Sequence, residues 1–137
     1  MQDVDIKTRE GTMDAKLFHP EGQQGPWPAI ILLMDAFGIR PVFEEMARRL
    51  ASERYVVLLP NVFYRAGHTS KLDLHGSFAD EAFRTRIYGL IGELTPERQK
   101  MDAAAELDFL ARHPLVKGPK VGRPSSPRSA VKAPSRR

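Results

Sequence analysis

The stretch AIILLMDAFGIRPVFEEMARRLASERYVVLLP, residues 29–60, decides the fold. It contains two apolar runs, residues 29–34 and 55–59, and neither alternates with polar residues. Such runs are typical of parallel strands that helices cover on both faces. Between them, Pro41 suits the first turn of a helix, whose apolar face comprises Phe43, Ala47, Leu50 and Ala51. The stretch therefore predicts a strand, a helix and a parallel strand joined by a right-handed crossover.

Shorter patterns extend this unit on both sides. Residues 4–8 and 13–18 alternate apolar and polar side chains around a turn near Gly11, which predicts an antiparallel hairpin. Residues 61–79 are expected to be irregular, and residues 79–94 are expected to form a helix that contains two glycines. The predicted fold class is α/β, with a mostly parallel sheet, an N-terminal antiparallel hairpin and flanking helices.

The last predicted helix and strand lead to an abrupt change in the sequence. Thr95 and Pro96 signal a helix start, and that helix is expected to end near His113. Residues 120–122 are placed to be the next parallel strand, but the apolar signal then stops. Residues 123–137, with four serines and three prolines, are expected to be disordered. The helix that begins at Thr95 and Pro96 is predicted to have an apolar face that comprises Ala103, Ala104, Leu107, Leu110 and Ala111.

The composition limits the classes of function. A length of 137 residues and a hydrophobic fraction of 42% indicate one globular domain. The absence of cysteine excludes disulfides, thiolate metal sites and a cysteine nucleophile. No apolar run is long enough to cross a membrane, and the first ten residues have no signal-peptide pattern. The expected location is therefore the cytoplasm, without a membrane partner.

The net charge of +4 comes from the C-terminal segment. Residues 123–137 hold five basic residues and no acid, so the remainder has 16 basic and 17 acidic residues. A basic tail can attach weakly, in a salt-sensitive manner, to nucleic acid or to acidic surfaces. This tail has no interleaved aromatic residues and no recognised motif, so nucleic acid is not the expected partner. A non-enzymatic chain that binds through the tail remains the alternative function.

Several local patterns together resemble the dienelactone hydrolase family of the α/β-hydrolases. They are the apolar strand followed by Asp35-Ala-Phe-Gly38, the run Arg48-Arg49-Leu50-Ala51 that leads to Tyr55-Val-Val-Leu-Leu-Pro-Asn61, the group Phe63-Tyr64-Arg65, and the segment from Asp102 to Lys120-Val121-Gly122. The resemblance covers residues 3–122, the N-terminal half of the family's domain. It implies hydrolysis of small carboxylic esters or lactones without a cofactor, through a Cys or Ser nucleophile and an acyl-enzyme.

The sequence departs from the family where the nucleophile should follow. The resemblance implies a nucleophile elbow, G-x-C-x-G or G-x-S-x-G, after residues 120–122, and a triad acid and histidine later in the chain. The sequence has no cysteine and no G-x-S-x-G. We therefore expect the domain at residues 1–122 to be truncated before the elbow and the chain to be inactive. Loss of the reading frame near Gly122 is one interpretation of the tail, and a genuine short protein is the other.

The resemblance assigns roles to four residues. Asp35 takes the place of the carboxylate that contacts the nucleophile, although the family usually has Glu there; otherwise Asp35 is a loop carboxylate that binds local N–H groups. The Ala36 N–H matches an oxyanion-hole donor. Arg84 matches an arginine that binds the substrate carboxylate, and Arg86 is an alternative, because a guanidinium binds a carboxylate in a bidentate manner. Both arginines also suit the solvent-exposed face of a helix.

The remaining polar and aromatic candidates are expected to be structural. No histidine has a ligand-type partner four residues further on, so none is predicted to be catalytic or to bind metal; the four are His19, His68, His75 and His113. Trp27, between two prolines, is expected to pack in a loop. A sheet without its second half would leave an apolar strand edge exposed, and self-association through that edge is expected.

Overall fold

The computed structural model describes residues 1–122, and the side chains of residues 1–118. Within these residues the strands form one five-stranded sheet in the order β1-β2-β4-β3-β5. The strands are β1 (Gln2–Thr8), β2 (Gly11–Phe18), β3 (Trp27–Ile31), β4 (Val56–Pro60) and β5 (Val116–Gly122). The helices are α1 (Pro41–Ser52), α2 (Glu81–Gly92) and α3 (Pro96–Arg112), with a 3-10 turn η1 (Thr69–Lys71) in the otherwise irregular segment before α2.

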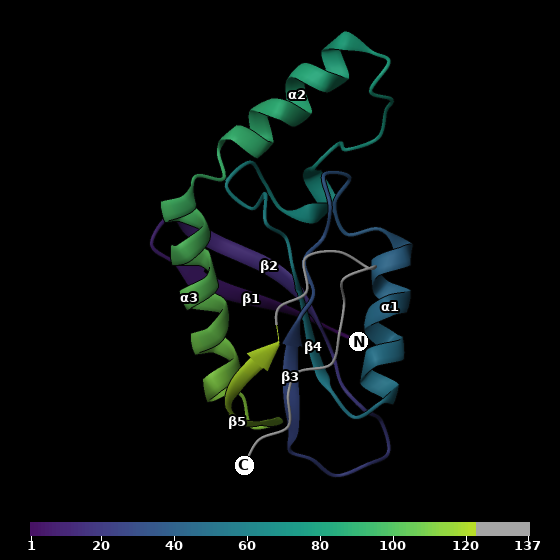
Figure 1. Ribbon diagram of the computed structural model, residues 1–137, viewed down its shortest axis with the longest axis vertical. Helices are drawn as coiled ribbons and strands as arrows, with labels where there is room; N and C mark the ends of the chain where they lie inside the picture. Colours follow the sequence, from purple (N-terminus) through teal and green to yellow (C-terminus); the bar gives the residue numbers. More distant parts are fainter. Residues whose placement is uncertain (123–137) are drawn as a thin grey trace.

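The strand pairing confirms the predicted fold class. β1 and β2 form the antiparallel hairpin, with Ile6 opposite Met13, and β2 is also antiparallel to β4. β3 is parallel to both β4 and β5. Figure 1 shows α1 and α3 on opposite sides of the sheet, and α2 beyond the end of the sheet. The result is an open mixed sheet with helices on both faces.

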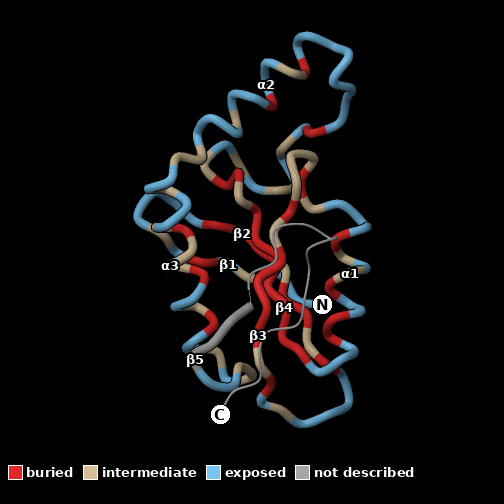
Figure 2. The backbone as a smooth tube through the Cα atoms, viewed as in Figure 1, coloured by how far each residue is buried: buried red, intermediate tan, exposed pale blue. Residues whose placement is uncertain are grey.

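The two apolar runs of the central unit are buried as predicted, except for Leu33, which is half-buried. Ile30 and Val57 pack with Phe43 of α1, whereas Ile31 and Leu58 pack on the other face with residues of α3. The predicted apolar face of α1 is the face that is buried. Figure 2 shows the buried residues concentrated in the central strands and on the sides of the helices that face them. Each face of the central strands therefore has its own apolar cluster.

The prediction for Trp27 was wrong. Trp27 is the first residue of β3, is 6% exposed and packs in the core cluster on the α3 side of the sheet. Its N–H donates a hydrogen bond to the Leu115 carbonyl (2.8 Å), at the start of the chain's approach to β5. Trp27 thus lies in the sheet although a proline precedes it and another follows it. The pairing of β3 with β5 is irregular at this end, and such an irregularity can accommodate proline.

The predicted apolar face of α3 was also wrong, except for Leu110. The buried residues of α3 are Asp102, Glu106 and Leu110. Leu107 is 39% exposed, and Ala104 and Ala111 are exposed as well. The helix does begin as predicted, because the Thr95 hydroxyl accepts a hydrogen bond from the Arg98 N–H (3.2 Å). The sequence therefore predicted the limits of α3 but not its rotation about its own axis.

The predicted disorder of residues 123–137 lies outside the described residues. Among residues 1–122, no helix combines the length and apolar character that a membrane span needs.

Candidate active site

The turn that follows β3 lies at the carboxyl edge of the parallel strands, where open α/β sheets bind ligands. Asp35 Oδ1 accepts a hydrogen bond from the Phe37 N–H (2.9 Å), and the Asp35 carbonyl accepts one from the Gly38 N–H (3.0 Å). Asp35 Oδ2 pairs with the guanidinium of Arg40. Both carboxylate oxygens therefore have partners within five residues, as a loop carboxylate would. The role of Asp35 beside a nucleophile stays a prediction.

A close contact from another loop fixes the shape of this turn. Gly38 has φ +85°, and a Cβ at this position would lie 2.6 Å from Leu74 Cδ1. Both observations require glycine at position 38. Ala36 lies within the same turn and packs at the margin of an apolar cluster that includes Met34 and Leu74. The backbone N–H that was predicted as an oxyanion donor therefore belongs to a turn held by the segment after η1.

An aromatic cluster lies against this turn. The ring centroid of Phe37 is 5.4 Å from that of Phe78 and 5.9 Å from that of Phe83, and Phe78 is 6.2 Å from Tyr88. Phe83 is 1% exposed, whereas Phe78 and Tyr88 are 39% and 58% exposed. The cluster therefore anchors α2 to the turn through a buried ring and leaves two partly exposed rings at the outer side of the site.

The two predicted substrate-binding arginines lie on α2. Arg84 donates a hydrogen bond to the Phe78 carbonyl (2.6 Å), and Arg86 lies over the Phe83 ring, 5.3 Å from its centroid. Within residues 1–118, neither guanidinium forms an ion pair with a carboxylate, and the cation beside Asp35 is Arg40. The structure thus brings both arginines to the aromatic cluster, and their role toward a substrate stays a prediction.

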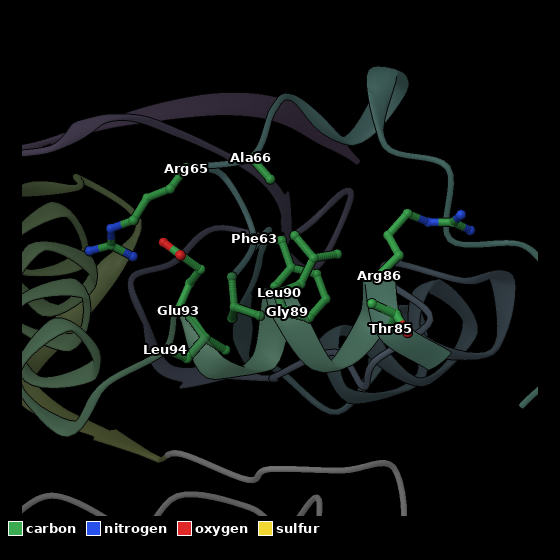
Figure 3. A pocket seen from close by; sticks show the side chains of 10 residues that line it. Phe63, Arg65, Ala66, Thr85, Arg86, Gly89, Leu90, Glu93 and Leu94 are labelled. Carbon is green, nitrogen blue, oxygen red and sulfur yellow. The ribbon is translucent and has the colours of Figure 1, made fainter. Parts of the chain in front are cut away.

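A cavity of about 410 Å³ separates α2 from the segment that follows β4. Figure 3 shows Phe63, Leu90 and Leu94 around it, with Arg86 directed away from the end formed by Glu93 and Leu94. Its lining is largely apolar, with Arg65, Arg86 and Glu93 as the charged members. A second cavity of about 230 Å³ lies at the ends of β3 and β4, and its lining includes Met34, Val62, Asp102 and Glu106.

A buried polar network holds the segment after β4 against α3. Arg65 donates two hydrogen bonds to the Asp102 carboxylate (2.9 and 2.8 Å), and the Tyr64 hydroxyl donates a third (2.9 Å). Arg65 also pairs with Glu10 in the turn of the hairpin, and Thr8 Oγ1 lies 2.8 Å from the Tyr64 hydroxyl. This network connects the hairpin, β4 and α3, and it positions one wall of both cavities.

The network shifts the protonation equilibria of its members in consistent directions. The hydrogen bond to Asp102 raises the pKa of Arg65 above its usual value. Burial raises the pKa of the Tyr64 hydroxyl, and the neighbouring Asp102 adds to that effect. The hydrogen bond from Arg65 lowers the pKa of Glu10. The shifts favour a charged Arg65, a neutral Tyr64 hydroxyl and a charged Glu10, which are the protonation states that the hydrogen bonds require. At neutral pH these groups therefore hold the structure together and do not exchange protons with a substrate.

One hydroxyl lies beside a base. The Ser70 hydroxyl is 2.9 Å from His68 Nδ1, and His68 Nε2 is 3.8 Å from Asp14 Oδ2. The Ser70 backbone N–H, however, donates to the same Nδ1 (3.0 Å), so the lone pair that a general base needs is already used. The distance of 3.8 Å is too long for a hydrogen bond. The arrangement therefore caps η1 and does not activate Ser70.

The other histidines have contacts that explain their positions. His19 stacks on Trp27 with ring centroids 6.4 Å apart, and His75 is almost fully exposed. His113 ends α3, and its Nδ1 accepts a hydrogen bond from the Leu115 N–H (3.2 Å). In the part of the chain that the structure describes, no group of three or more acidic or histidine side chains gathers as a metal site would require.

Sequence reasoning missed the aromatic cluster and the buried network. Their members come from segments far apart in the chain, so no local spacing joins them. One signal was present: Tyr64, Arg65 and Asp102 all lie in the segments that resemble the family. A tyrosine and an arginine at the end of a buried strand, and an acid on the next long helix, could have suggested a buried pair.

The model of the Dienelactone hydrolase family matches residues 13–123. The chain belongs to the dienelactone hydrolase family. The matched range includes the Asp35–Gly38 turn, the aromatic cluster and most of the buried network. Membership confirms the resemblance that the sequence indicated.

Individual relatives agree with the family match. A candidate carboxymethylenebutenolidase from Escherichia coli (strain K12) is 29% identical over 106 residues, which are 77% of this chain and 35% of that protein. The carboxymethylenebutenolidase of Rhodococcus opacus is 35% identical over 60 residues, which are 44% of this chain and 24% of that protein. The chain thus spans about a third of the length of the first of these relatives.

Solved structures share the fold. The chain is similar to a candidate dienelactone hydrolase from Klebsiella pneumoniae, with TM-score 0.74 and 21% identity over 90% of this chain and 48% of that chain. It is also similar to a dienelactone hydrolase-like promiscuous phosphotriesterase from metagenomic libraries, with TM-score 0.66 and 26% identity over 90% of this chain and 47% of that chain. The chain therefore covers about half of these dienelactone hydrolase-like structures.

Proposed function

We propose that this chain provides the N-terminal half of a site that hydrolyses small carboxylic esters or lactones. The observation that carries the proposal is the family match over residues 13–123. The Asp35–Gly38 turn supports it, because this turn lies at the carboxyl edge of the parallel strands, beside an aromatic cluster that suits an organic substrate.

In the proposed reaction a Cys or Ser nucleophile attacks the carbonyl carbon of the ester and expels the alcohol, and water then releases the acid from the acyl-enzyme. The Ala36 N–H stabilises the oxyanion of the tetrahedral intermediate. Asp35 orients the nucleophile, while Arg40 holds the Asp35 side chain in the turn. Arg84, or Arg86 in its place, binds a carboxylate group on the substrate.

We further propose that the 137-residue chain does not turn over by itself, because its sequence has no cysteine and no G-x-S-x-G. The test is hydrolysis of a p-nitrophenyl ester by purified protein, corrected for the uncatalysed rate and measured over a range of protein concentrations. We expect a slope of zero for the native chain and for Ser70→Ala. A slope that is positive for the native chain and lost in Ser70→Ala would assign activity to Ser70.

The positive part of the proposal is tested in a chimera. Residues 13–122 replace the structurally matching part of the candidate dienelactone hydrolase from Klebsiella pneumoniae, of which this chain covers 48%, and hydrolysis of an anionic lactone is measured. Arg84→Ala should raise KM at least about tenfold through loss of a charge-assisted hydrogen bond, whereas Arg112→Ala, on the exposed face of α3, should leave KM unchanged. Equal KM values in the two variants would contradict the role of Arg84.

The basic tail supports a second candidate function, attachment to nucleic acid or to acidic surfaces. Five cations and no acid lie in residues 123–137. Retention on DNA at low salt should then disappear when these residues are deleted. Retention that survives the deletion would refute this function.

A further inference from the structure

The outer edge of β1 is open to another strand. β1 is the first strand in the order of the sheet, and within the described residues it pairs with β2 alone. Such an edge presents backbone N–H and C=O groups that a further strand can bind. β1 has no proline, and its register with β2 has no bulge, so neither device prevents a further strand from pairing with this edge; its charged side chains are of both signs.

The charged side chains of β1 lie on one face of the strand. Asp3, Asp5 and Lys7 are exposed on that face, whereas Ile6 on the other face is 3% exposed and packs toward α3. Asp3 already pairs with Lys16 of β2 (3.1 Å). In the part of the chain that the structure describes, neither Asp5 nor Lys7 takes part in an ion pair. Two opposite charges thus stand side by side at the edge, available to an incoming strand.

These charges select one register for a second copy of β1. In an antiparallel pair that places Ile6 opposite Ile6, Asp5 faces Lys7 of the second copy and, by two-fold symmetry, Lys7 faces its Asp5. A pair centred on Asp5 places two aspartates opposite each other, and a pair centred on Lys7 places two lysines opposite each other. A shift by a single residue would place the apolar face of one strand beside the charged face of the other. Of the registers centred on Asp5, Ile6 and Lys7, only the one centred on Ile6 has no like-charge pair.

The space beside β1 also suits an added strand. A groove of about 320 Å³ lies between β1 and α3, and its lining includes Ile6, Ala105 and Phe109. In the register centred on Ile6, the apolar side chains of the second β1 lie on this same side of the sheet. They would meet Phe109, which is half-buried and packs at the margin of the core.

We propose that a second copy of this chain adds to the β1 edge as an antiparallel strand centred on Ile6, so that two sheets join across a two-fold axis. The interface is isologous, and each dimer contains the Asp5–Lys7 pair twice. The proposal concerns the edge opposite β5 and does not depend on the proposed hydrolase function.

Charge reversal tests the register. Asp5→Lys places the introduced lysine opposite Lys7 of the second copy, and Lys7→Asp places the introduced aspartate opposite its Asp5. Each variant alone should weaken the dimer at least about tenfold, because two attractive cross-strand pairs become repulsive. A mixture of the two variants should associate again, because every cross-strand pair is then complementary. The double variant with both reversals should associate like the native chain.

Sedimentation velocity of the full chain measures these outcomes, with circular dichroism to follow folding. Native chain, mixture and double variant should contain dimer at about 100 µM, where a micromolar dimer is saturated, and each single variant should sediment mainly as monomer. Association of the mixture also shows that both single variants are folded. A monomeric native chain, or single variants that associate as well as the native chain, would overturn the proposal.

Discussion

Replacing Asp102 by alanine should destabilise the protein far more than the same change at Asp108. Both aspartates lie on α3 and both pair with an arginine. Asp102 is 6% exposed and accepts hydrogen bonds from Tyr64 and Arg65. In the Asp108–Arg112 pair, by contrast, the side chains are 56% and 78% exposed. The two variants therefore differ in burial while the helix, the residue type and the kind of partner stay the same.

The magnitude follows from what remains after the change. Asp102→Ala leaves the Arg65 guanidinium, whose side chain is 12% exposed, with Glu10 as its other carboxylate. Removing one partner of a buried ion pair costs about 3–5 kcal/mol. Because Glu10 still neutralises part of the charge, we expect about 3 kcal/mol of unfolding free energy to be lost. Asp108→Ala should cost about 0.5 kcal/mol or less, since its pair is solvent-exposed.

Urea unfolding followed by the fluorescence of Trp27 measures both changes. Trp27 is the single tryptophan and is 6% exposed, so its emission reports on the core. With a slope of about 1.5 kcal/mol per molar urea, Asp102→Ala should lower the midpoint by about 2 M and Asp108→Ala by less than about 0.4 M. Equal midpoints for the two variants would show that the Arg65–Asp102 pair is not what holds α3 to the sheet. Combining Arg65→Met with Asp102→Leu should recover most of the loss, because apolar side chains can replace a buried pair.

Two further predictions concern the turn of the site and the end of α3. Gly38→Ala should lower the unfolding free energy by about 1–3 kcal/mol, because alanine is strained at φ +85° and its Cβ would meet Leu74. Gly89→Ala, where an added Cβ would have nothing within 4 Å, should raise the unfolding free energy by about 0.5–1 kcal/mol. Urea unfolding of both variants measures the two changes. Burial, and then the neighbouring His19, hold the pKa of His113 below its usual 6.5. The unfolded chain therefore binds a proton more readily than the folded one, and the unfolding free energy should fall as the pH drops below about 6.5. Unfolding curves at several pH values should show that His113→Gln flattens this pH dependence, and an unchanged slope would contradict the prediction.

Local patterns were sufficient for the central unit of the fold. The runs at residues 29–34 and 55–59 are apolar at every position, which predicts cover on both faces, and the structure buries every residue of the two runs except the half-buried Leu33. The helix between them shows its buried face through the spacing of Phe43, Ala47 and Leu50. Thr95 predicted the start of α3 because a hydroxyl cap acts within three residues of itself.

The candidate site was predictable only in part. The position of the Asp35–Gly38 turn at the end of a buried strand follows from the order of the elements. The partners of Asp35 and the aromatic rings around Phe37 depend on how α2 and its preceding loop fold back, and no local spacing contains that information. The proposed roles of Ala36 and Arg84 remain predictions.

By itself, the sequence determined the α/β order of the elements, the antiparallel hairpin and the absence of a cysteine or a G-x-S-x-G, since each depends on neighbouring residues or on composition. Only the tertiary structure decided which side of α3 faces the sheet. Apolar spacing favoured Ala104, Leu107 and Ala111, but the helix buries Asp102 and Glu106. The physical reason is that a carboxylate can be buried when a cation meets it, and the cation for Asp102 is Arg65, 37 residues earlier in the chain.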